Sequence, residues 1–227
     1  MPGVLTRAAG DLATPRQRLA AWADLMLVDH GVFRAIYLNR HEVAPGIWRS
    51  AQPSPGDLQR LADQGLKTVL NLRGVRRCSS YLLEVDACQR FGLTLIDLPI
   101  GSREGPPLDR IERAAEVFTR AERPLLMHCK SGADRAGMMA ALYLLIHERR
   151  PVAEAAKQLS LRFGHVQAAR TGVLDAVLAA FAASGTADFL AWARTAYDPD
   201  AIKAAFLATG AAQRWSSHLV DRVLRRE

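Results

Sequence analysis

The stretch His128-Cys129-Lys130-Ser131-Gly132-Ala133-Asp134-Arg135-Ala136-Gly137 decides the fold. The apolar run before it, residues 124–127, predicts a short buried strand, and the apolar run over residues 138–147 predicts a helix. A strand, a tight loop and a helix N-terminus together make an anion site, because inward backbone N–H groups and the helix dipole favour negative charge. The same field stabilises a thiolate. We therefore expect Cys129 to be an ionised nucleophile and Arg135 to hold two oxygens of a bound phosphate.

These residues resemble a known signature. The pattern HC-x-x-G-x-x-R, from His128 to Arg135, is similar to that of the cysteine-dependent protein tyrosine and dual-specificity phosphatases. A weaker similarity, WRSAQP at residues 48–53, resembles the RSxQP segment of bacterial and fungal atypical dual-specificity phosphatases. The resemblance implies that Cys129 forms a phosphocysteine, that Arg135 binds the phosphoryl group and that His128 supports the loop. The residues expected to bind the phosphate through the loop are Lys130, Ser131, Gly132 and Ala133.

Apolar runs and turn residues predict strands that alternate with helices. Strands are expected at residues 47–50, 67–72, 93–100 and 124–128, and helices at residues 15–38, 54–64, 80–91 and 108–120. Beyond residue 151 only helices are expected, at 151–162, 172–183, 187–196, 198–209 and 211–225. This order predicts an α/β fold with a mainly parallel central sheet of four to five strands flanked by helices, and extra helices at both ends.

We divide the chain into an N-terminal helical extension (1–44), a phosphatase domain (45–183) and a C-terminal helical extension (184–227). Ligands bind beyond the carboxyl ends of parallel strands. Arg73, the loop 101–107 and the loop 129–135 all follow such strand ends, so Arg73 is a further candidate for substrate binding.

The proton donor for the leaving group is the first departure from the family pattern. The family takes an aspartate from the loop before the cysteine strand, yet residues 101–105 read GSREG. We favour Asp134, which precedes the arginine as in myotubularin-like lipid phosphatases, over the alternatives Glu104 and Asp97.

Ala136 is the second departure. The family has Ser or Thr there, whose hydroxyl helps the thiolate to leave in the second step. Its absence predicts slow hydrolysis of the phosphocysteine, with Ser131 as the hydroxyl that would have to substitute.

Composition is that of ordinary globular protein, with 49% hydrophobic and 23% charged residues in 227. Three cysteines argue against a disulfide framework, so a reducing compartment and structural roles for Cys78 and Cys88 are expected. The sequence has no apolar run of the roughly 18 residues that a membrane span needs and no clean signal peptide, which predicts a cytoplasmic protein. The histidines and cysteines lack metal-ligand spacing, and no metal or other cofactor is expected.

The net charge of +7 comes mainly from arginine and suits acidic or phosphorylated partners. No aromatic-interleaved basic stripe points to nucleic acid, whereas peripheral contact with an anionic membrane stays open. The leading hypothesis is a phosphoprotein phosphatase of the tyrosine or dual-specificity class. The alternatives are a phosphatase for phospholipids or inositol phosphates, and a pseudophosphatase that binds phosphorylated partners without turnover.

Overall fold

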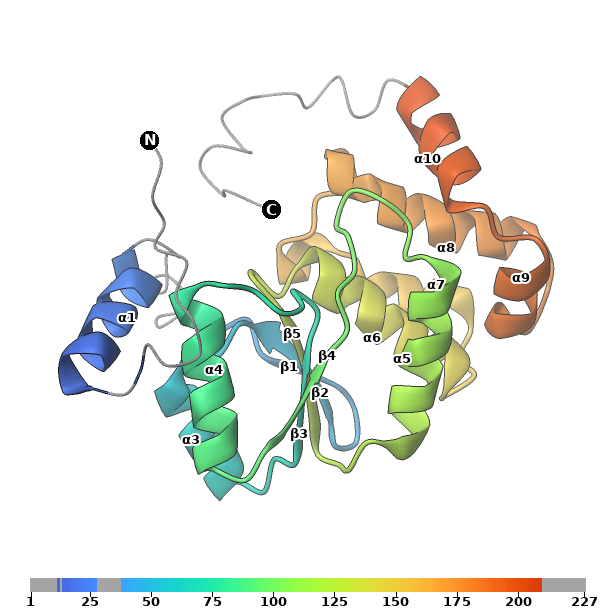
Figure 1. Cartoon of the computed structure of the whole chain (residues 1–227). Helices are drawn as coiled ribbons and strands as arrows, with labels where there is room; N and C mark the ends of the chain where they lie inside the picture. The colour runs from blue at the N-terminus through green and yellow to red at the C-terminus, as the bar shows by residue number, and fades with distance from the viewer. Residues whose placement is uncertain (1–11, 13, 28–37, 210–227) are drawn as a thin grey trace.

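A computed structural model describes residues 12, 14–27 and 38–209. Its centre is a five-stranded sheet in the order β1-β2-β5-β3-β4. The strands are β1 (His41–Ala44), β2 (Ile47–Ala51), β3 (Thr68–Asn71), β4 (Thr94–Asp97) and β5 (Leu125–Cys129). Only the β1–β2 pair is antiparallel. The predicted α/β class with a mainly parallel sheet is therefore confirmed (Figure 1).

Helices cover both faces of this sheet (Figure 1). The described helices are α1 (Pro15–Leu27), α3 (Pro55–Asp63), α4 (Ser79–Arg90), α5 (Leu108–Arg120), α6 (Asp134–Ile146), α7 (Val152–Ala155), α8 (Val173–Ala183), α9 (Phe189–Thr195) and α10 (Pro199–Ala208). Of these, α1 packs on α4 and α10 packs on α8 at the periphery. Short 3₁₀ turns are η1 (Ala156–Gln158), η2 (Leu161–Phe163) and η3 (Arg170–Gly172). Within the described ranges, none of the helices has both the length and the hydrophobicity that a bilayer crossing requires.

The start of α3 shows how local sequence sets an element. Ser54 is the N-cap, its side chain accepts a hydrogen bond from the Asp57 backbone, and the Asp57 carboxylate accepts one from the Ser54 backbone. Pro55 occupies the first helical position, where its missing N–H costs nothing. This reciprocal capping box fixes the helix start where the sequence predicts it.

The alternation of side chains along β5 divides the core into two layers. Leu125, Met127 and Cys129 face the large cluster formed with α5, α6, α8 and α9. Leu126 faces the smaller cluster formed with α3 and α4. His128, one step beyond Leu126 on that side, is directed toward α4. Because all thirteen residues of α6 are buried, that helix forms the centre of the fold.

The structure adds one strand to the predicted elements and changes two of them. The hairpin strand β1 was not predicted, because its sequence HEVA is short, edge-located and half polar. The turn at Gly46, with φ +74°, joins it to β2. The predicted helix 151–162 breaks after α7 and η1, since Leu159 (ψ 82°) and Ser160 (ψ 162°) leave helical geometry. The third predicted strand, 93–100, contracts to β4.

The chain ends limit what the structure shows of the helical extensions. The predicted helix 15–38 is described as α1, and its remainder and the predicted helix 211–225 lie outside the described residues. On α9, Phe189 and Trp192 pack against Phe181 of α8 and belong to the main core. The three-part division of the chain stays a prediction.

Candidate active site

The loop formed by residues 129–135, here called the Cys129 loop, lies between β5 and α6 at the carboxyl edge of the sheet. Cys129 ends β5 opposite Ala51 of β2, and Arg135 is the second residue of α6. Both side chains are buried, with exposures of 2% and 9%. Gly132 has φ +73°, and a Cβ there would lie 2.5 Å from the Ala51 backbone nitrogen. The loop therefore needs glycine both for its turn and for its close approach to β2.

Arg49 of β2 holds the Cys129 loop through hydrogen bonds to two of its backbone carbonyls. Its guanidinium donates from Nη2 to the carbonyls of Gly132 (2.7 Å) and Ala133 (2.9 Å). Its Nη1 donates to the backbone carbonyl (2.6 Å) and side-chain Oε1 (2.9 Å) of Gln158. The side chain is fully buried, with its guanidinium carbon 4.2 Å from the centroid of the Phe163 ring. Two charge-assisted hydrogen bonds thus hold the loop carbonyls of Gly132 and Ala133, and two more tie the same guanidinium to Gln158.

Burial lowers the pKa of Arg49 to about 10, although attraction to Cys129 and Asp134 opposes this shift. The guanidinium is therefore still a cation at neutral pH. It is a fixed positive charge that interacts electrostatically with Cys129 and Asp134.

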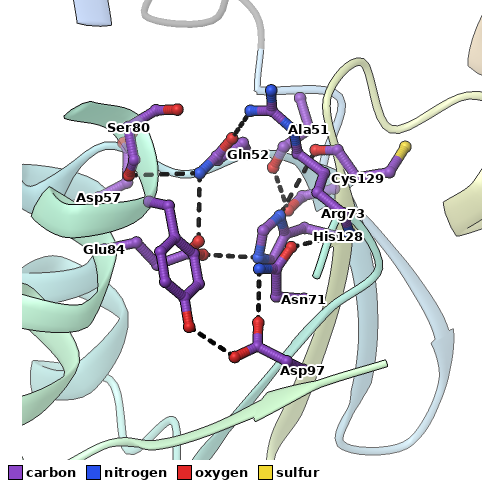
Figure 2. Close-up of polar contacts among 12 residues, drawn as sticks. Ala51, Gln52, Asp57, Asn71, Arg73, Ser80, Glu84, Asp97, His128 and Cys129 are labelled. Carbon is purple, nitrogen blue, oxygen red and sulfur yellow. Dashed lines mark hydrogen bonds and ion pairs between the residues drawn. The ribbon is translucent and has the colours of Figure 1, made fainter. Parts of the chain in front are cut away.

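A buried polar network lies behind His128 (Figure 2). His128 Nε2 lies 2.6 Å from Glu84 Oε1, and both side chains are at most 1% exposed. Glu84 Oε2 accepts from Gln52 Nε2 at 3.1 Å, and Gln52 Oε1 accepts from Arg73 Nη1. The network joins the ends of β2, β3 and β5 to α4. It gives the predicted supporting role of His128 a structural basis.

Arg73 is brought to this edge of the sheet as predicted, but it is engaged in the network. Its backbone N–H also donates to Asn71 Oδ1 at 2.9 Å. Its guanidinium contacts Gln52 (Figure 2). A direct role in substrate binding stays a prediction.

Asp97, an alternative proton donor, is held at the end of β4. Its two oxygens accept from Asn71 Nδ2 (2.8 Å) and from the hydroxyl of Tyr81 (2.7 Å) (Figure 2). Burial and this carboxylate together raise the pKa of Tyr81. Two occupied oxygens favour a structural role for Asp97.

Glu104, the other alternative, is exposed on the loop before α5. Its side chain folds over Gly101, and Oε2 lies 3.7 Å from Lys203 Nζ of α10. A carboxylate that is 55% exposed and close to a surface lysine is a weakly held group. It stays an alternative.

Asp134, the favoured donor, is the first residue of α6 and is 4% exposed. Its Oδ1 lies 2.7 Å from Nδ1 of His165, whose Nε2 lies 2.7 Å from Oδ2 of Asp175. Burial opposes a charge on His165, but the two carboxylates outweigh it and raise the pKa of His165 to about 9. A charged histidine therefore binds the favoured donor.

The remaining loop residues form the rim. Ser131 is exposed, and Lys130 is half-buried. The Asn39 amide donates to the carbonyls of Ser131 (3.0 Å) and Phe163 (2.9 Å), which joins the loop to η2. Ala136 is fully buried and brings no hydroxyl.

The three cysteines are free thiols. Cys88 packs in the smaller core cluster, where burial, with help from Glu84 and Asp97, raises its pKa to about 12. It is an inert packing residue, as predicted. Cys78 is the N-cap of α4, with its sulfur 3.3 Å from the Ser80 hydroxyl oxygen.

Five residues that the structure places around the candidate site were not singled out from the sequence. Arg49 and Gln52 lie inside the quoted WRSAQP segment, so that motif was the available signal. For the others, Glu84, His165 and Asp175, no spacing in the sequence connects them to the Cys129 loop, because only folding brings α4, the η2–η3 segment and α8 to it.

A family model described as "DSP-PTPase phosphatase fused to NAD+ Kinase" matches residues 19–173. The chain belongs to this family. It is thus a phosphatase of the cysteine-dependent DSP-PTPase superfamily, and the match covers the Cys129 loop and the strands on either side of it.

Curated relatives include NAD kinase 2, chloroplastic, of Arabidopsis thaliana, which is 26% identical over 107 residues. That match covers 46% of this chain and 11% of the plant protein. A probable NAD kinase 2 of Oryza sativa subsp. japonica is 26% identical over 103 residues, 44% of this chain and 10% of the rice protein. The matched part is about a tenth of these relatives' length.

Solved structures show the same fold. TpbA of P. aeruginosa is 21% identical with a TM-score of 0.50, covering 67% of this chain and 88% of that one. A putative phosphatase of Shewanella putrefaciens CN-32 is 20% identical with a TM-score of 0.52, covering 64% and 90%. The core domain of the PP-IP phosphatase SIW14 of S. cerevisiae, in complex with citrate, is 20% identical with a TM-score of 0.50, covering 60% and 83%.

Proposed function

We propose that this phosphatase hydrolyses phosphate monoesters through a phosphocysteine at Cys129 and that its substrates are phosphorylated tyrosine, serine or threonine side chains of proteins. The observation that carries the proposal is the Cys129 loop itself: a tight turn between the central strand and the central helix, with a buried cation, Arg49, fixed behind it.

The reaction has two balanced steps. In the first, the Cys129 sulfur forms a bond to phosphorus while the phosphorus–oxygen bond to the leaving group breaks, and the leaving oxygen takes a proton from an acid. In the second, a water oxygen attacks phosphorus while the group that gave its proton in the first step takes a proton from that water, the sulfur–phosphorus bond breaks, and phosphate and the thiolate are released. Arg135 and the loop N–H groups hold the three equatorial oxygens through both steps.

Positioning supplies most of the rate in this scheme, because the loop is fixed before substrate arrives. Arg49, Asn39 and Gln158 tie its outer side to β2 and to the segment 156–163. Asp134 is the proposed proton donor, and its Oδ1 lies 2.7 Å from Nδ1 of His165.

The basic residues around the loop favour a second candidate, a phospholipid or inositol phosphate. Lys130 follows the nucleophile directly, and Arg76 and Arg77 follow Arg73 in the loop after β3. Extra cations next to a phosphate site suit a substrate with more than one phosphate group.

The plant relatives add a third substrate to test. The family description joins a phosphatase to a NAD+ kinase, so a phosphorylated nicotinamide dinucleotide belongs among the substrates to be assayed. We restrict the proposal for this chain to phosphatase chemistry, since it matches only about a tenth of those kinases.

Steady-state assays on wild type and Cys129→Ser test the proposal. The panel is p-nitrophenyl phosphate, a phosphotyrosine peptide, a phosphoserine peptide, a phosphoinositide and NADP. Turnover by wild type that Cys129→Ser abolishes supports the proposal, and the highest kcat/KM identifies the substrate class. Binding of phosphopeptide without turnover of any substrate would instead establish a pseudophosphatase.

A further inference from the structure

We propose that His165 is a positioning residue of the phosphatase reaction, which holds the Asp134 carboxyl group in place beside the Cys129 loop and is itself held by Asp175. This inference rests on the proposed function. It concerns a side chain that lies 30 residues beyond Arg135 in the sequence and outside the phosphatase signature.

The two hydrogen-bond contacts of the His165 ring define its protonation state. Nδ1 lies 2.7 Å from Asp134 Oδ1 and Nε2 lies 2.7 Å from Asp175 Oδ2. A carboxylate only accepts hydrogen bonds, so both contacts are satisfied when both ring nitrogens carry protons. The ring is 1% exposed and cannot exchange these partners for water. His165 is therefore an imidazolium between two carboxylates.

Two nearby carboxylates compensate the positive charge of the His165 ring. Asp134 from α6 and Asp175 from α8 are the ionisable groups that act on it and support a pKa of about 9. Arg49 of β2 also interacts electrostatically with Asp134. Arg162 and His41 lie around the Phe163 ring, two residues before His165.

Backbone contacts fix the ring's own position. The His165 N–H donates to the Ser160 carbonyl at 3.1 Å, and Gly164 before it has φ +81°, where an added Cβ would lie 3.8 Å from the Ala133 side chain. The segment that carries the histidine thus packs directly against the Cys129 loop. A histidine with a fixed backbone and two fixed partners can set the orientation of Asp134 as a carboxylate sets that of a histidine in other enzymes.

The far end of this chain of hydrogen bonds reaches the surface. Asp175 lines a hollow of about 290 Å³ between α7 and α8, with Gln167, Val152 and Leu178. Its side chain is 18% exposed. The histidine can therefore regain a proton through Asp175 while substrate covers the Cys129 loop.

The chemistry of this arrangement concerns the leaving group. In the first step the leaving oxygen receives a proton through Asp134: the His165 Nδ1 proton moves to the Asp134 carboxylate, the carboxyl group gives a proton to the leaving oxygen, and the step ends with a neutral His165 beside an Asp134 carboxylate. An ester with a poor leaving group needs this proton most, and one with a good leaving group needs it least. The size of the effect of His165 should therefore depend on the leaving group.

The test compares His165→Asn and Asp175→Asn with wild type on phenyl phosphate and p-nitrophenyl phosphate, with His147→Asn as the matched control. His147 is an exposed histidine at the other end of α6. We expect His165→Asn to lower kcat for phenyl phosphate by about 10²-fold, and for p-nitrophenyl phosphate much less, with KM nearly unchanged. His147→Asn should match wild type.

A pH profile separates positioning from support of the fold. Wild-type kcat for phenyl phosphate should fall above pH 9, where His165 loses its proton. Asp175→Asn removes one stabilising carboxylate and should move this fall down by about one to three pH units. It also carries the test if His165→Asn does not fold. Ring ¹⁵N NMR at pH 8 should show two N–H groups on His165, a readout independent of turnover.

Equal losses of kcat on the two substrates, an alkaline limb that Asp175→Asn leaves in place, or a neutral His165 at pH 8 would each overturn the inference. Failure of wild type to hydrolyse either substrate would instead contradict the proposed function.

Discussion

Replacing Arg49 by methionine tests the idea that a buried cation fixes the Cys129 loop. The substitution keeps the length and apolar contacts of the side chain but removes its four hydrogen bonds to Gly132, Ala133 and Gln158. Acceptors left unpaired inside a protein cost about 1–3 kcal/mol each. Their sum is about 4–12 kcal/mol.

One effect acts in the opposite direction. Burial lowers the pKa of Arg49 to about 10 even after attraction to Cys129 and Asp134, a net cost to the charged form of about 3 kcal/mol, which methionine removes. The unpaired acceptors outweigh this gain, and partial access of water reduces their cost. We expect a net loss of about 2–5 kcal/mol in the free energy of unfolding.

Urea unfolding and kcat/KM for p-nitrophenyl phosphate measure the outcome. Arg49→Lys keeps the charge but cannot make the forked contacts, so we expect it to regain less than half of the lost stability. Arg194→Met is the control. It removes an exposed ion pair with Glu112 (2.8 Å), which should cost less than about 1 kcal/mol. An Arg49→Met protein as stable and active as Arg194→Met would refute the reasoning.

Four further results are expected. Gly132→Ala should cost about 2–4 kcal/mol and most of the activity, because it strains a positive φ and meets the β2 backbone; chemical denaturation and turnover check this. Ala136→Ser should restore a hydroxyl near the thiolate and raise the rate of phosphocysteine hydrolysis by at least about tenfold, seen as loss of a burst in rapid-quench experiments. Iodoacetamide at neutral pH should alkylate Cys129 and leave Cys88, whose pKa is raised to about 12, untouched in the folded protein; peptide mapping shows which thiol reacts. Unfolding at several pH values should show about 3 kcal/mol of stability from His165 below pH 6.5 that is lost as pH rises to 9, since its folded pKa is raised; a flat profile contradicts this.

Local signals made most of the fold predictable. The capping box at Ser54 and the helical spacing of apolar residues over 108–120 are signals contained within one short segment. Accordingly, α3 and α5 start at the expected positions. By contrast, β1 is a polar edge strand whose existence depends on pairing with β2. A short segment does not specify which strand it will pair with, so the sequence did not predict β1.

The site divides in the same way. Cys129 and Arg135 could be assigned because strand, loop and helix follow one another in the chain. Arg49 and His165 act through contacts 83 and 31 residues apart in the sequence. Such contacts are set by which side of a strand faces which helix, and only the assembled core determines that.

The Asn39 side chain has a practical consequence. The Asn39 amide donates hydrogen bonds to the carbonyls of Ser131 and Phe163. A residue that precedes β1 therefore joins the Cys129 loop to η2. A shortened protein that began at residue 45, the predicted start of the phosphatase domain, would lose these two hydrogen bonds together with β1. Anyone preparing a minimal version for crystallisation or screening should begin upstream of residue 39.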